Sequence, residues 1–112
     1  MKFVNLRIRT GESVKTIALN VDAIQSVEQL NPMFPHELTE QQSAPHAVMA
    51  YDTHKGQYIC NVRTHNSHTN IVEYIPVDED CQAVYLITLK NGGVYICLDG
   101  DLPVAFAELL GF

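Results

Sequence analysis

Three loop histidines are the residues of this sequence most suited to hold a metal ion. His65 and His68 share an HxxH spacing in one polar loop, and His54 lies in the preceding turn. Zinc needs three or four converging ligands, with imidazole nitrogens at about 2.0–2.1 Å. If residues 57–63 form a strand, His54 and His65 lie near its opposite ends, about 30 Å apart. We therefore expect solvent-exposed histidines, with zinc bound at a subunit interface as the alternative.

The tyrosines are the second group with chemical potential, because all five fall in apolar, strand-like runs. They are Tyr51, Tyr58, Tyr74, Tyr85 and Tyr95. Aromatic pairs across neighbouring strands are a common structural use of such residues. The functional alternative is a ligand site, in which Tyr51, Tyr58 and Tyr74 line a concave face that takes a small planar ligand or a peptide.

Arrangements for covalent catalysis are missing from the sequence. No serine has a GxSxG context, and GxGxxG, P-loop and HExxH motifs do not occur. Cys60 precedes His65 by five residues, which places the two side chains on opposite faces of an extended segment. Asp99 and Asp101 could offer two carboxylates to a cation, but a helix N-cap role for Asp101 explains the pair more simply. We expect no enzymatic activity.

The cysteines indicate a reducing environment. Cys60, Cys81 and Cys97 are odd in number, have no CxxC spacing and lie in or beside apolar runs. We expect reduced, buried thiols in a cytoplasmic protein, although a single disulfide is compatible with the sequence.

Alternating apolar residues predict the elements that carry these groups. Period-two patterns and apolar runs predict strands at 3–9, around Ile17 and Leu19, and at 24–30, 47–51, 57–63, 71–77, 83–89 and 94–98. Gly11 and the Asn91–Gly92 pair predict two hairpins. Residues 31–46 hold three prolines and predict a long loop.

The last residues predict a helix. Leu102, Phe106, Leu109 and Leu110 form one apolar stripe, with Pro103 in the first turn and Gly111 after the end. The strands at 83–89 and 94–98 are apolar at nearly every position, which is typical of a sheet covered on both faces. We therefore predict one α+β domain over 1–112: six to eight mostly antiparallel strands with a C-terminal helix on one face of the sheet.

Two segments resemble known families. The order of strand, Asn-Gly hairpin and helix is similar to that of the FlbD-like flagellar proteins and of the LytTR-type DNA-binding domain. It is carried by residues 17–28, residues 87–98 and the helix predicted after them. The resemblance covers less than half of the chain and consists mostly of hairpin residues. LytTR domains continue into a basic DNA-contacting stretch, whereas residues 71–112 of this chain carry seven acidic side chains and only Lys90 as a cation. We expect no nucleic-acid binding.

Charge and length narrow the remaining function classes. The 112 residues carry a net charge of −6, and no stretch approaches the length of a membrane span. We expect a non-catalytic binding or regulatory module that acts through protein–protein contacts as a homodimer, with residues 31–46 and the acidic C-terminal surface in contact. The alternative is a ligand- or metal-binding protein that uses the histidines and nearby tyrosines, with hydrolysis as one activity.

Overall fold

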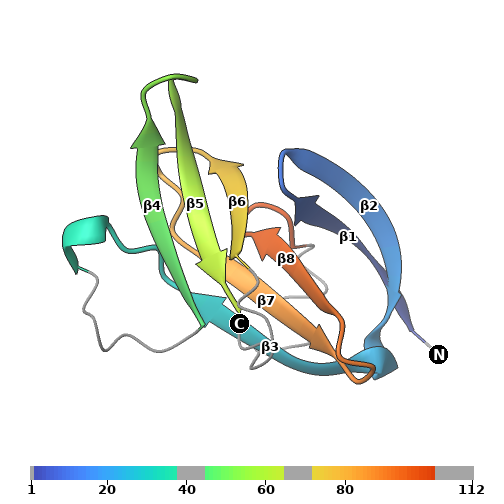
Figure 1. The fold of residues 1–112 in the computed structure, drawn as a ribbon. Coiled ribbons are helices and arrows are strands. Elements are labelled where there is room, and N and C mark those ends of the chain that lie inside the picture. The colour runs from blue at the N-terminus through green and yellow to red at the C-terminus, as the bar shows by residue number, and fades with distance from the viewer. Residues whose placement is uncertain (1, 38–44, 65–71, 103–112) are drawn as a thin grey trace.

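The structure is a computed structural model, and it describes residues 2–37, 45–64 and 72–102. Eight strands make up most of this part of the chain (Figure 1). They are β1 (Phe3–Thr10), β2 (Ser13–Asn20), β3 (Ile24–Leu30), β4 (His46–Asp52), β5 (Gln57–Arg63), β6 (Val72–Val77), β7 (Val84–Leu89) and β8 (Val94–Leu98). Two short 3-10 helices, η1 (Val21–Ala23) and η2 (Pro35–Glu37), are the only helical elements among the described residues.

The α+β class predicted from the sequence is wrong, because the described residues form an all-β structure without an α-helix. The strand positions are confirmed, and all five strand pairs are antiparallel. They form three separate sheets rather than one, in the orders β1–β2, β3–β7–β8 and β4–β5–β6. Of the helix predicted over residues 102–110, only Leu102 belongs to the described part.

The physical reason for the difference is that strands cover both faces of the central sheet, β3–β7–β8. A helix was expected to cover one of these faces. In the structure the β4–β5–β6 sheet lies on one side, and the β1–β2 hairpin lies on the other. The prediction that 83–89 and 94–98 are covered on both faces is confirmed, because Leu86 and Ile87, adjacent in sequence, are both buried.

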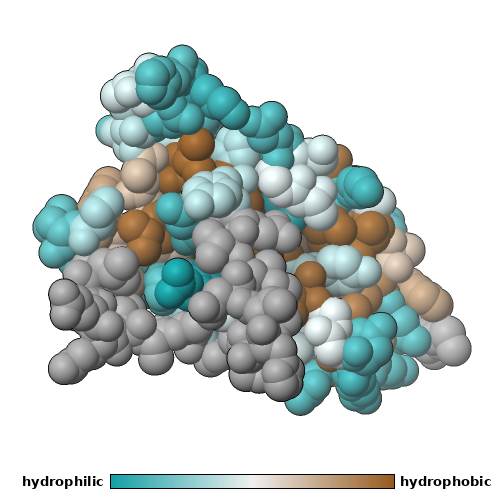
Figure 2. Space-filling model, viewed as in Figure 1, coloured by the Kyte–Doolittle hydropathy of each residue, from teal (hydrophilic) through white to brown (hydrophobic). Residues whose placement is uncertain are grey.

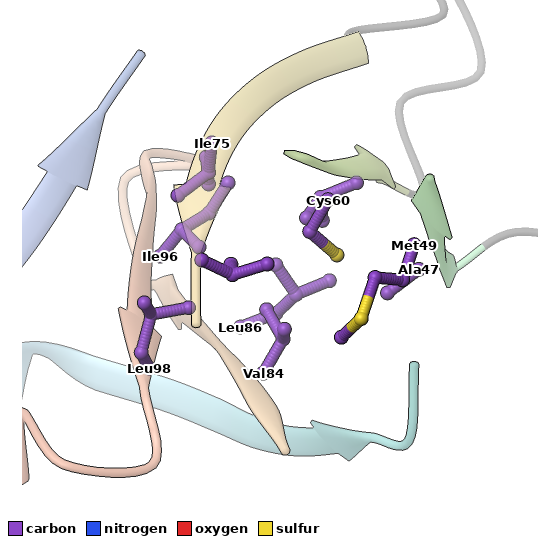
Figure 3. Packing of buried hydrophobic residues seen from close by; sticks show 10 residues of the cluster. Ala47, Met49, Cys60, Ile75, Val84, Leu86, Ile96 and Leu98 are labelled. Atoms are coloured by element: carbon purple, nitrogen blue, oxygen red, sulfur yellow. The ribbon is translucent and has the colours of Figure 1, made fainter. Parts of the chain in front are cut away.

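The core between the central sheet and β4–β5–β6 is built from alternate residues of five strands (Figure 3). Its buried members are Ala47, Met49, Cys60, Val62, Ile75, Val77, Val84, Leu86, Ile96 and Leu98. Leu86 stands opposite Ile96 in the ladder, so the two side chains point to the same face. Sheet-on-sheet packing of this kind removes most of these side chains from water, the main favourable contribution to folding.

A second core lies between the central sheet and the β1–β2 hairpin. Its buried members are Leu6, Ile8, Leu19, Ile87, Leu89 and Cys97. Ile87 and Cys97 are the residues that point away from the first core, as the alternation of side chains in a strand requires. Leu102, the last described residue, packs at the margin of this second core.

The outer edge of β4 is partly covered by the proline-rich segment. Met33 forms a parallel bridge with Val48, in which its N–H donates to the Ala47 carbonyl and its carbonyl accepts from the Met49 N–H, at 2.9 and 2.7 Å. Phe34 stacks on His36 beside this bridge. Of the long loop predicted over 31–46, residues 38–44 lie outside the described part. The described portion thus protects the β4 edge from pairing with other strands.

Candidate functional site

The hairpin of β1 and β2 pairs with no other strand of the described structure, and each of its two strands is eight residues long. Gly11, with a φ of 58°, and Glu12 form its two-residue turn, and Thr10 stands opposite Ser13. A positive φ at the first turn position alone is typical of a type II′ turn, which suits the twist of paired strands. Among the described strands, β2 pairs only with β1, and it lies at the margin of the molecule in Figure 1.

The phase of the hydrogen-bond ladder shows which backbone groups of β2 point outward. The Val21 N–H donates to the Lys2 carbonyl at 2.9 Å. Because bonded and non-bonded pairs alternate along an antiparallel ladder, every second residue from Val21 back to Ser13 bonds to β1. The N–H and C=O groups of Val14, Thr16 and Ala18 therefore point away from the hairpin. We call these backbone groups the free edge of β2.

The side chains around the free edge are accessible on both faces. Residues 13–16 and Ala18 are exposed. On the outer face, turned away from the core, Val14 is 42% exposed and Phe3 on β1 is 58% exposed. These are large apolar side chains that gain from being covered.

Positive charge gathers on this hairpin. Residues 1–20 carry four cations and one anion, whereas residues 21–112 carry three cations and twelve anions. Lys15 stands opposite Ile8 and so points to the core-facing side of β2, while Arg7 stands opposite Thr16 on the outer face. Both are exposed, and neither is in an ion pair with another described residue. The hairpin thus carries a positively charged side chain on each face beside the free edge of β2.

A buried ion pair holds β1 against the end of β8. Arg9 donates from Nε and Nη2 to the two carboxylate oxygens of Asp101, at 2.8 and 2.9 Å. The Asp101 carboxylate also accepts from the Leu98 N–H at 3.0 Å, and its side chain is 2% exposed. Burial alone would raise the pKa of Asp101, but the Arg9 and Leu98 hydrogen bonds outweigh it and lower that pKa. The same contact raises the pKa of Arg9.

The second ion pair of the hairpin is exposed. Lys55, in the turn between β4 and β5, donates to Glu12 in the turn between β1 and β2. This hydrogen bond lowers the pKa of Glu12 and raises the pKa of Lys55. Figure 2 shows hydrophilic side chains over the projecting β4–β5 turn, so this contact forms in water.

The tyrosines proposed as a ligand site are divided between two faces. Tyr51 and Tyr58 are opposite in the β4–β5 ladder and pack edge to face, with ring centroids 5.0 Å apart and an interplanar angle of 64°. This confirms the expectation of cross-strand tyrosine pairing. Tyr74 stands opposite Asn61, on the other face of the same sheet, and is 60% exposed. The three rings therefore do not line one surface.

The predicted metal ligands are not gathered in the described part of the chain. His54 is exposed in the β4–β5 turn, where its N–H donates to the Asp52 side chain at 2.9 Å. His65 and His68 lie outside the described residues. Within residues 2–37, 45–64 and 72–102, no three His, Cys, Asp or Glu side chains are placed to hold a metal ion such as zinc.

Asp99 and Asp101 do not converge on a common point. The Asp99 carboxylate accepts from the Gln82 N–H at 3.4 Å, whereas the Asp101 carboxylate is engaged by Arg9. The N-cap role expected for Asp101 depends on residues outside the described part. In the structure Asp101 instead joins the end of β8 to β1 through Arg9, a role that the sequence did not suggest.

Burial keeps two of the thiols protonated. It raises the pKa of both Cys60 and Cys97 to about 12. Cys81 is half-buried, and burial and the nearby Asp99 raise its pKa as well. None of the three forms a disulfide. Thiolate is the nucleophilic form of cysteine, so these environments disfavour covalent chemistry.

Sequence reasoning missed the free edge of β2. Lys15 between Val14 and Thr16 gave a signal, because a charged residue in the middle of an otherwise pairable strand is typical of an edge. Strand order, however, depends on contacts distant in sequence.

Comparison of the chain with protein-family models, curated proteins and solved structures finds no match. No helix in the described residues has the length and apolar character required to cross a membrane.

Proposed function

We propose that this protein is a non-catalytic binding module that works through protein–protein contacts, and that the free edge of β2 accepts a strand from its partner. The observation that carries the proposal is the eight-residue β2, whose outward N–H and C=O groups have no strand partner in the described structure. Such groups form main-chain hydrogen bonds with any extended segment of suitable side-chain pattern. The exposed Phe3 and Val14 add apolar area beside them.

The covered edge of β4 strengthens this choice of surface. There, Met33 supplies backbone hydrogen bonds to both Ala47 and Met49. Natural sheets protect exposed edges in this way because unpaired edges associate with other chains. An edge left open on an eight-residue strand is consistent with a partner that occupies it.

The homodimer predicted from the sequence remains a prediction, with a changed rationale. The sequence suggested contact through residues 31–46 and the acidic C-terminal surface, and the apolar faces of 83–89 and 94–98 are covered by the chain itself. A second copy would instead add at β2, antiparallel to the first, about a two-fold axis near Thr16.

Two variants at one position test the proposal. Thr16→Pro removes an outward N–H without removing a bond to β1, and proline is tolerated in edge strands at such positions. Thr16→Val keeps the N–H and serves as the matched control. Light scattering reports self-association, and amide chemical shifts of Val14, Thr16 and Ala18 report added strand peptides.

We expect a strand peptide or a second copy to shift these three amides in the unmodified protein and in Thr16→Val. In Thr16→Pro, which has no amide at position 16, the amides of Val14 and Ala18 should stay unshifted. If no strand peptide and no self-association perturbs these amides at millimolar concentration, the proposed function is wrong. A circular dichroism spectrum of Thr16→Pro equal to that of the unmodified protein shows that the variant is folded.

A further inference from the structure

We infer that the strand accepted at β2 is an extended acidic segment of another protein, with apolar residues alternating with its carboxylates. This inference rests on the proposed function and specifies the partner. It depends on three features of the hairpin: the position of Lys15, the position of Arg7, and the apolar residues that share the outer face with Arg7.

Lys15 lies in the middle of the free edge, on the face that continues towards the core. It stands opposite the buried Ile8 and is itself exposed. A strand added to β2 places one side chain directly across from Lys15, about 4.5–5.5 Å away between Cβ atoms. A carboxylate at that position forms a cross-strand ion pair, whereas an apolar residue covers the ammonium group without a partner.

The same lysine disfavours a second copy. In an antiparallel pair of β2 strands centred on Thr16, the two Lys15 residues become diagonal neighbours about 7–8 Å apart. Like charges at that distance repel within the Debye length of physiological salt. A charge that points inward on an edge strand is one of the ways in which natural sheets avoid pairing with themselves.

Arg7 extends the positive charge to the outer face. It is exposed opposite Thr16, and its guanidinium is close enough to lower the pKa of Asp101 without forming an ion pair to it. Pairing of the β1–β2 hairpins of two copies would bring their cations together, although anions outnumber cations in the rest of the chain. An acidic segment is attracted by this region and meets no such repulsion.

The apolar side chains determine the other half of the partner's pattern. Val14 and Phe3 are exposed on the outer face, and Ala18 lies between them along the edge. Because successive side chains of a strand point to opposite faces, residues that meet Val14 and Ala18 alternate with the residue that meets Lys15. The preferred segment therefore alternates carboxylates with β-branched or other apolar residues.

Four acetylated, amidated peptides test the inference: four repeats each of Val-Glu, Val-Lys, Val-Thr and Pro-Glu. The Pro-Glu peptide has the charge of the Val-Glu peptide but lacks half of the backbone donors needed for strand addition. Binding is measured by fluorescence anisotropy and mapped on the amides of Val14, Thr16 and Ala18. The protein variants are Lys15→Glu and, as the control with the same charge change on the exposed Lys90, Lys90→Glu.

We expect the Val-Glu peptide to bind more tightly than the other three, and Lys15→Glu to weaken it about tenfold while favouring Val-Lys. Lys90→Glu should bind Val-Glu as the unmodified protein does. Equal binding of Pro-Glu and Val-Glu would overturn the inference, since it would show attraction without strand addition.

Other results separate the inference from the proposed function. If Val-Thr or Val-Lys binds as well as Val-Glu and shifts the three amides, the edge accepts strands but the acidic preference is wrong. If light scattering shows a dimer that Thr16→Pro dissociates and no peptide binds, a second copy is the partner and the inference is again wrong. If neither peptides nor a second copy reach the edge, both proposals fail.

Discussion

The two ion pairs that attach the β1–β2 hairpin to the rest of the molecule differ in almost every physical respect. Arg9 and Asp101 form two parallel hydrogen bonds, and the aspartate is withdrawn from water. Glu12 and Lys55 join two turns at the surface, where both side chains are more than half exposed. A removed charge leaves an unpaired, desolvated partner only in the first case. Burial of the charged groups, rather than the presence of opposite charges, therefore determines which contact stabilises the hairpin.

Asp101→Ala should have the largest effect. It leaves the Arg9 guanidinium and the Leu98 N–H without their acceptor, and breaking a buried pair in this way costs about 3–5 kcal/mol. The loss is measured as the change in the free energy of unfolding in urea. A loss no greater than that found for Lys55→Ala would show that the two pairs are equivalent.

Arg9→Lys should have a smaller effect. Lysine keeps the charge but cannot donate the two parallel hydrogen bonds that Arg9 directs at the carboxylate. We expect a loss of about 1–2 kcal/mol, the order of one hydrogen bond to a charged group. Arg7→Lys, at an exposed position on the same strand, is the matched control and should leave the unfolding free energy unchanged.

Acid should weaken the buried pair through Asp101. The pKa of Asp101 is lower in the folded protein than in the unfolded chain, so its contribution is fully present above the unfolded pKa. It is lost as the pH falls from about 4 through the folded pKa. Protonation retains an acceptor oxygen, so the loss is smaller than in Asp101→Ala. Asp101→Asn cannot titrate, so its Tm should fall less steeply than that of the unmodified protein as the pH is lowered below about 4. The same dependence of Tm on pH in both proteins would refute this assignment.

Lys55→Ala should have the smallest effect, with no measurable change in Tm. Exposed pairs gain little because water and salt screen them. A double-mutant cycle with Glu12→Ala should yield no detectable coupling. Coupling that persists at 1 M NaCl would show that the contact is shielded from solvent and would remove the contrast between the two pairs.

The sequence was informative where structure depends on neighbours along the chain. Alternation placed the strands, Gly11 indicated the first hairpin, and the uninterrupted apolar runs at 83–89 and 94–98 indicated burial on two faces. The candidate site was harder to predict from the sequence than the strands were. Cross-strand tyrosine pairing was anticipated. Whether Tyr74 shares a face with Tyr51 depends on the register between strands, because a shift of one residue moves a side chain to the opposite face of the sheet.

Long-range pairing explains what the sequence did not reveal. Arg9 and Asp101 are 92 residues apart, and nothing in the local sequence of either indicates the other. The division of eight strands into three sheets depends on which apolar faces meet after collapse. A helix on the sheet was a reasonable expectation for an apolar face, but the β1–β2 hairpin supplies the same apolar area from the other end of the chain.

The central β3–β7–β8 sheet has a consequence for how the molecule opens. Its strands belong to both cores, so a fluctuation that separates either outer layer exposes one side of the same strands to water. The two cores therefore cannot melt one after the other without loss of the layer that they share. We expect a single cooperative transition and the slowest hydrogen exchange at the buried amides of Ile87 and Cys97, whose N–H groups bond between β7 and β8 and exchange only when the whole described structure unfolds.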